Sequence, residues 1–317
     1  MVEIVVSALA PIVVTLLLGL VAAWRHDFGP NGASTLNRMV LLYAVPIALF
    51  VGTVSTPRAD LARDVAFIIA ICVAIIGLYA VVFLLFRFVF HFSLGESVLA
   101  ALAASAPAVP FMGPAILGDL FGKGSAVSIA IAGLVINLIV VPITILSLAS
   151  GETASSSAAS QTAMPPADFL KTVLETVKAP MVWAPVLAFV LVLCGVRIPL
   201  LVSHALSLLG QASGGVALFS SGIMLAAYKI KIDRNVLLLV LLKNIVQPAL
   251  VLSGLLSLGY GTPVVPEAVL TAAIPTMPLV IVLAVQYRVA EARASATLFL
   301  SMVASIFTMG IFIALTR

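Results

Sequence analysis

The sequence PAVPFMGP at residues 107–114 lies in the middle of an apolar run, 97–121, that is long enough to cross a bilayer. Proline lacks a backbone donor and its ring clashes with the preceding turn, so a helix cannot run unbroken through these three prolines. In hydrocarbon, a freed backbone group costs several kcal/mol unless protein or trapped water satisfies it. Because a broken span is tolerated only where it is buried in protein or lines a cavity, the sequence predicts such a place here.

A second apolar run, 268–287, is interrupted in the same way by PTMP at residues 275–278. Two interrupted spans in corresponding positions of two halves indicate the binding site of a transporter. The half-helix that begins after each break has free N–H groups and a dipole of roughly +0.5 charge, which suit a carboxylate. The alternative is that the prolines only kink two packed helices. The predicted substrate-binding residues at the two breaks are Pro107, Ala108, Val109, Pro110, Phe111, Met112, Gly113, Pro275, Thr276, Met277 and Pro278.

The composition is that of an all-α polytopic membrane protein. Of the 317 residues, 63% are hydrophobic and 9% are charged, whereas a soluble domain averages about 25% charged residues. The apolar runs lack the alternation over about ten residues that a membrane β-barrel requires. About ten transmembrane helices are expected, at roughly 20 residues each. They cover residues 4–24, 38–54, 65–86, 97–121, 126–148, 181–196, 205–228, 236–258, 268–287 and 294–315.

The two halves of the chain resemble each other. ESVLAA at 96–101 precedes the first Pro-x-x-Pro, and EAVLTA at 267–272 precedes the second. With five spans in each half, the second copy must enter the membrane from the opposite side, which is an inverted repeat. We therefore expect a first five-helix repeat at 1–149, a polar Ser/Ala/Thr-rich cytoplasmic linker at 150–178, and a second inverted repeat at 179–317.

Basic residues set the expected orientation. Loops on one side of the predicted membrane carry ten Lys and Arg residues, and those on the other side carry five. The side with ten should be cytoplasmic, so both termini are expected outside a bacterial plasma (inner) membrane. The first apolar run has no basic segment before it, so it is expected to be a mature span rather than a cleaved signal.

Lys243 is the one cation predicted to lie well inside a span. Gln247 follows it by one helical turn on the same face, and Asn244 lies beside them. A charge in the membrane is costly and marks a functional site by default. Lys243 could bind a substrate carboxylate, or act as a tethered cation in place of a coupling ion. The alternative is a lysine that snorkels to the interface.

Two single residues complete the candidate substrate site. Asn137 lies in the fifth predicted span, where an amide often bonds a neighbouring helix instead of a ligand. Tyr43 lies in the second predicted span, with simple helix packing as its alternative role.

Cofactors and metals are not expected. Cys72 and Cys194 fall inside predicted spans, and His26, His91 and His204 have no spacing typical of metal ligands. The chain has no phosphate-binding G-x-x-x-x-G-K-[ST] motif, so it is not expected to drive transport with ATP by itself. The histidines lie at predicted interfaces, so a nucleophile–base pair at membrane depth, and with it an enzyme, is not expected.

Three motifs carry a resemblance to the auxin efflux carrier family, and within it to bacterial malonate or small-carboxylate carriers. They are ASAPAVPFMGP at 104–114, LKNIVQP at 242–248 and AAIPTMP at 272–278. The resemblance implies a five-plus-five inverted repeat with two broken crossing helices, as in bile-acid symporters and sodium–proton antiporters. It implies a scaffold domain of helices 1, 2, 6 and 7, and a core transport domain of helices 3–5 and 8–10 that moves against it. Many family members have Asn in each crossover, where this chain has Ala108 and Leu279, which shifts the expected binding to backbone groups.

The expected function is secondary active transport, or uniport, of a small organic anion, with malonate or a similar carboxylate first. A sodium- or proton-coupled carrier of another organic anion, or an efflux carrier of auxin-like weak acids, is the alternative. Few carboxylates lie inside predicted spans, which argues against a dedicated proton antiporter. The expected partners are the lipid bilayer and the anion, with a coupling ion and a homodimer left open and no nucleic acid.

Overall fold

A computed structural model of the chain describes residues 2–28, 32–54, 65–122, 125–157, 180–196, 198–227, 232–262 and 264–316. These residues form helices throughout, and the one β-bridge that they contain is isolated. In chain order the helical segments are α1 (Val2–Trp24), α2 (Gly32–Met39), η1 (Val40–Ala44), α3 (Val45–Val54), α4 (Val65–Cys72), η3 (Val73–Gly77), α5 (Leu78–Leu84), η4 (Leu85–Val89), α6 (Leu94–Ser105), α7 (Val109–Phe121), α8 (Ser125–Val135), η6 (Ile136–Val140), α9 (Val141–Ser157), α11 (Pro180–Leu193), α12 (Leu200–Ala227), α13 (Arg234–Leu241), η8 (Leu242–Val246), α14 (Gln247–Ser257), α15 (Val264–Ala273), α16 (Leu279–Gln286) and α17 (Glu291–Leu315).

The helices form a membrane-type bundle. Five of the described helical stretches are long and apolar enough to cross a membrane: Phe67–Val89, Ile131–Ser150, Leu201–Ser220, Arg234–Ser257 and Glu291–Leu315. Large apolar side chains are exposed along them, such as Leu208 and Phe307, which suits hydrocarbon rather than water as the surrounding solvent. The predicted all-α membrane class is therefore confirmed.

Both predicted broken spans are broken in the structure. α6 has 12 residues and α15 has 10, which at 1.5 Å per residue gives about 18 Å and about 15 Å. Neither half-helix alone can cross a hydrocarbon core of about 30 Å. α7 and α16 continue the two spans after the breaks.

The first break is shorter than the proline pattern predicts. α7 begins at Val109, so only Pro107 lies in the break, whereas Pro110 falls in the first turn of the new helix. Proline is tolerated there because the N–H groups of a first turn have no partner in the helix anyway. α7 ends at Phe121, and Gly122 caps it with a φ of 66°, in the left-handed region that glycine adopts without strain.

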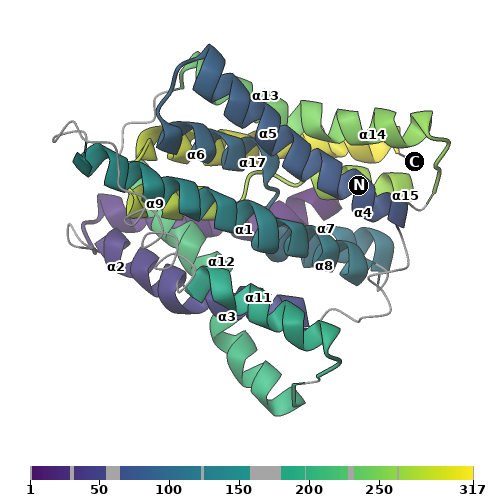
Figure 1. The fold of residues 1–317 in the computed structure, drawn as a ribbon, viewed down its shortest axis with the longest axis horizontal. Helices are drawn as coiled ribbons and strands as arrows, with labels where there is room; N and C mark the ends of the chain where they lie inside the picture. Colours follow the sequence, from purple (N-terminus) through teal and green to yellow (C-terminus); the bar gives the residue numbers. More distant parts are fainter. Residues whose placement is uncertain are drawn as a thin grey trace.

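The helices pack in the same order in both halves of the chain. α5 packs on α6 as α14 packs on α15, and α7 packs on α8 as α16 packs on α17. α1 packs on α12, and α11 packs on α3. In Figure 1, α3, α11 and α12 lie along one edge of the molecule, and α13 and α14 lie along the opposite edge.

Two π-helical turns also match between the halves. η3 follows the eight residues of α4, and η8 follows the eight residues of α13. Both turns contact α6, and η8 also contacts α15. A π turn disturbs the regular i→i−4 bonding of a helix and is common at functional sites.

The predicted linker at 150–178 begins inside a helix, because α9 continues to Ser157. Residues 158–178 lie outside the described part of the chain, so the rest of this prediction stays a prediction.

α1 and α12 approach until their backbones touch. A Cβ atom added at Gly222 would collide with the Leu16 carbonyl oxygen, and one added at Gly19 would collide with the Phe219 carbonyl oxygen. Small residues at helix interfaces allow such contact in membranes, where packing rather than the hydrophobic effect holds helices together. This pair of glycines therefore fixes how α1 lies on α12.

We predict that Gly222→Ala destabilises the protein by about 1–3 kcal/mol, because the added methyl group must push two backbones apart. Gly310→Ala, in α17, is the matched control, since a Cβ atom there meets nothing within 4 Å. The control should be neutral or gain up to about 1 kcal/mol of helix propensity. Thermal unfolding in detergent compares the two; equal melting temperatures would contradict the close approach.

Candidate functional site: the crossover of two broken helices

The two breaks lie against each other and hydrogen-bond to each other. Pro107 and Thr276 form an isolated antiparallel bridge. The Ala108 N–H donates to the Pro275 carbonyl oxygen at 2.8 Å, and the Met277 N–H donates to the Ala106 carbonyl oxygen at 3.1 Å. Each break thus satisfies backbone groups that the other has freed, which is what burial of non-helical backbone at membrane depth requires.

Thr276 ties the crossover to two other helices. Its N–H donates to Ser301 Oγ of α17 at 3.0 Å, and its hydroxyl donates to the Ala103 carbonyl oxygen of α6 at 2.8 Å. Ser301 in turn donates to Asn244 Oδ1 at 2.7 Å, and Asn244 Nδ2 donates back to the Ser301 carbonyl oxygen at 2.7 Å. All three side chains are buried. The predicted residues Thr276 and Asn244 are therefore joined in one network.

Lys243 and Gln247 together bond to the ends of both half-helices that precede the breaks. Lys243 Nζ donates to the Ala272 carbonyl oxygen at 2.7 Å, near the end of α15, and to Gln247 Oε1 at 2.6 Å. Gln247 Nε2 donates to the Ser105 carbonyl oxygen at 2.8 Å, at the end of α6, and to the Ala74 carbonyl oxygen of η3 at 3.2 Å. Lys243 does not snorkel, because its exposed fraction is 0%.

The other predicted residues are placed as follows. Ala108, Val109, Met112, Pro275, Met277 and Pro278 are buried. Gly113 is also buried, and a Cβ atom there would lie 3.0 Å from a side-chain carbon of Ile129 in α8, so it serves helix packing. The side chains of Pro110 and Phe111 lie outside the described part of the structure.

Asn137 and Tyr43 have different surroundings. Asn137 lies in η6, which contacts α11; it is 5% exposed, and its Oδ1 has no hydrogen-bond partner among the described residues. Tyr43 lies in η1 with an exposed fraction of 59%. The described contacts do not join either residue to the Lys243 network, so their role in the site stays a prediction.

Sequence reasoning missed Ser301 and three carbonyl groups, those of Ala74, Ser105 and Ala272. A serine in an apolar helix is common, so Ser301 gives no distinctive signal. A carbonyl group gives none at all, except that those near a predicted helix end are unpaired by default.

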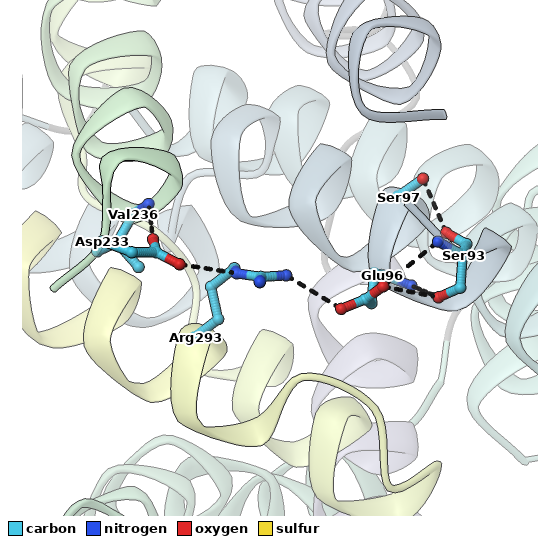
Figure 2. A network of polar contacts seen from close by, with 6 residues as sticks. All are labelled: Ser93, Glu96, Ser97, Asp233, Val236 and Arg293. Atoms are coloured by element: carbon cyan, nitrogen blue, oxygen red, sulfur yellow. Dashed lines mark hydrogen bonds and ion pairs between the residues drawn. The ribbon is translucent and has the colours of Figure 1, made fainter. Parts of the chain in front are cut away.

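A second polar network closes one end of the same helices (Figure 2). Arg293 of α17 lies between Glu96 of α6, at 3.2 Å, and Asp233, at 3.6 Å. Asp233 caps α13 by accepting the Val236 N–H at 2.8 Å. Glu96 forms a capping box with Ser93 at the start of α6. The network therefore fixes the first turns of α6, α13 and α17 relative to one another.

A family profile described as "Membrane transport protein" matches residues 4–313. The chain belongs to this family of membrane transporters. The resemblance to auxin efflux carriers is thereby confirmed, and this membrane transport protein is a transporter rather than an enzyme. It is 30% identical to the "Uncharacterized transporter YfdV" of Escherichia coli (strain K12), over 98% of each chain. It is 26% identical to the "Putative malonate transporter" of Rhizobium meliloti (strain 1021), over 92% of this chain and 90% of the relative.

We predict that Thr276→Val destabilises this membrane transport protein by about 1–3 kcal/mol, because the Ala103 carbonyl oxygen loses its buried donor. Thr276→Ser keeps the hydroxyl and is the matched control. Thermal unfolding of the purified variants measures the difference. A valine variant as stable as the serine variant would show that the network does not hold the crossover together.

Proposed function

We propose that the protein is a secondary transporter, or uniporter, of a small organic anion, with malonate or a similar carboxylate as the first candidate. The observation that carries this proposal is the pair of broken helices hydrogen-bonded to each other in the core of a membrane transport protein. The relative from Rhizobium meliloti whose printed name includes malonate adds support for the substrate class. Another organic anion, or an auxin-like weak acid, is the second candidate.

The electrostatics of the crossover favour an anion. The half-helices α7 and α16 begin there, and each contributes roughly +0.5 charge at its N-terminus. α6 and α15 end there with opposite partial charges of similar size. The buried Lys243 ammonium bonds to the end of α15 and to Gln247, whose amide bonds to the end of α6. The lysine charge therefore leaves the crossover with net positive character in a low-dielectric surrounding, where it attracts a carboxylate most strongly.

Backbone groups are the expected ligands in the breaks. Ala108 and Leu279 stand at the positions where many family members have Asn, and both side chains are apolar and buried. Anion recognition would then depend on N–H groups at the starts of α7 and α16, as at other helix N-termini. Ala108 has an exposed fraction of 0%, so the described conformation is closed at this point and substrate entry requires movement.

We infer that this movement takes place between two domains built from an inverted repeat of 1–149 and 179–317. The repeat is supported by the matching packing order of the two halves and by the equal placement of η3 and η8. The scaffold would comprise α1, α2, α3, α11 and α12, and the core would comprise the remaining helices. Displacement of the core against the scaffold would expose the crossover to each side in turn.

The proposed orientation has the 150–178 linker in the cytoplasm and both termini outside a bacterial inner membrane. The Arg293 network supports the grouping of three segments on one side, because Glu96, Asp233 and Arg293 lie in contact. The excess of basic residues is what assigns that side to the cytoplasm.

Flux into liposomes tests the function. Purified protein should take up radiolabelled malonate, with a series of mono- and dicarboxylates as competitors and protein-free liposomes as the background. Uptake no faster than the background under outward and inward substrate gradients, for every carboxylate in the series, would refute the proposal.

We predict that Pro278→Ala lowers this flux about tenfold or more, the equivalent of at least about 1.4 kcal/mol in the transport cycle. Pro278 precedes α16 at its N-cap, and an alanine there lets the helix extend into the break and withdraw N–H groups from the ligand. Pro107→Ala tests the first break in the same way, because Pro107 is the proline that lies between α6 and α7. Unchanged flux in both single variants and in the double variant would move the substrate site away from the crossover.

The orientation gives a separate prediction. Single cysteines introduced at Ser156 and at Arg317, in a background without Cys72 and Cys194, should react with membrane-impermeant reagents from opposite sides of the membrane. Whole cells should label the residue 317 variant, and inverted vesicles should label the residue 156 variant. Labelling of both variants from the same side would contradict the inverted repeat.

A further inference from the structure

The half-helices α6 and α15 both point their C-terminal carbonyl groups at the crossover. The C-terminus of a helix carries partial negative charge and unpaired carbonyl oxygens. In membrane transporters, such half-helix ends and unwound carbonyls are the groups that bind coupling cations. The crossover therefore presents the chemistry of a cation site, made from the Ser105 end of α6 and the Ala272 end of α15.

That place is occupied by the Lys243 ammonium. Nζ lies 2.7 Å from the Ala272 carbonyl oxygen and 2.6 Å from Gln247 Oε1. The Gln247 amide passes the interaction on to the Ser105 carbonyl oxygen at 2.8 Å. One side-chain pair, four residues apart on one helix, thus reaches the ends of both half-helices.

Two further features fit a cation held by neutral oxygens. Both atoms that accept hydrogen bonds from Nζ among the described residues are uncharged oxygens. The buried charge of Lys243 is therefore compensated by the partial negative charge of the helix ends and not by a carboxylate. The Ser105 hydroxyl at the end of α6 is fully buried and has no hydrogen-bond partner among the described residues. This hydroxyl belongs to the same residue whose carbonyl oxygen accepts from Gln247, so it is one more neutral oxygen that could contact a cation.

We propose that Lys243 is a resident cation, which fills the place of a diffusible coupling cation, so that this protein moves its anion without sodium. A bound sodium ion enters and leaves in each cycle, whereas a lysine ammonium stays attached to η8 and moves only with the core helices. The inference rests on the proposed anion transport, and it removes sodium as the energy source.

The geometry separates this role from direct binding of substrate. The two bonds from Nζ both run to groups of the protein, on α15 and on the same helical turn. An ammonium has three N–H donors, and these bonds use two of them. Because Lys243 is fully buried, a substrate carboxylate cannot reach the remaining donor in the described conformation. The resident cation instead acts on the anion through its charge and by holding the half-helices in place.

Ion replacement on the wild-type protein is the first test. Malonate flux in liposomes is measured with sodium, potassium or choline as the only monovalent cation, and flux in choline should remain within about twofold of flux in sodium, since no dissociable cation takes part. Flux that requires sodium would overturn the resident cation while the transport function stands. Absence of flux in all three salts, for malonate and for every other carboxylate in the series, would instead refute the proposed function.

A second test needs no flux. Lys243→Ala leaves Gln247 Oε1 and the Ala272 carbonyl oxygen without their cation, so its melting temperature should rise, saturably, with sodium, ammonium or methylammonium. Tetramethylammonium is a control for ionic strength, because it has no N–H to donate and its methyl groups keep its charge away from the oxygens. The wild-type melting temperature should not respond to these cations. Stabilisation of the wild type by sodium, or a Lys243→Ala protein that is indifferent to every cation, would refute the proposal.

Lys243→Met covers the case in which the alanine variant fails to fold, because it fills the same space without charge. Its flux should fall about tenfold or more, as expected when buried helix ends lose their counter-charge. Arg25→Met removes a charge at an exposed position and should transport like the wild type. Lys243→Met flux equal to that of Arg25→Met would overturn the resident cation.

Discussion

The fold depends on one constraint, which is that backbone groups freed at membrane depth must find partners inside the protein. Each break frees both N–H donors and carbonyl acceptors, and all of them need partners. Here the two breaks solve this jointly, through the bond from Ala108 to Pro275 and the bond from Met277 to Ala106. The crossing is therefore the condition under which either helix can be broken at all.

The Lys243 segment extends the same solution to the ends of α6 and α15. It also makes the two halves of the chain unequal. Lys243 is the ninth residue after Arg234, and the ninth residue after Val65 in the first half is Ala74. Ala74 supplies only a carbonyl oxygen, which accepts from Gln247 at 3.2 Å. The polar turn of the second half thus bonds to the half-helix ends of both halves. A second lysine at position 74 would add a buried charge with no group to compensate it.

The sequence predicted the breaks and the buried lysine because both violate strong local rules: proline in a span and charge in hydrocarbon. It predicted too long a first break, since Pro110 is as acceptable in a first helical turn as in a loop. It could not identify Ser301 or the Ser105 and Ala272 carbonyl groups, because their role arises from tertiary packing of α6, α15 and α17. Tyr43 broke no such rule: a tyrosine in a span can face lipid or line a pocket, and its exposed fraction of 59% could not be predicted from residue type.

The contacts within the two proposed domains bear on alternating access. The core helices α6, α13, α15 and α17 are joined by directional polar bonds, at the crossover through Thr276 and at one end through Arg293. α1 and α12 are joined by direct backbone packing at Gly19 and Gly222. Directional bonds inside the core resist internal shear, and they keep the half-helix ends and the Lys243 ammonium in register. We therefore expect movement between the proposed core and scaffold rather than within the core.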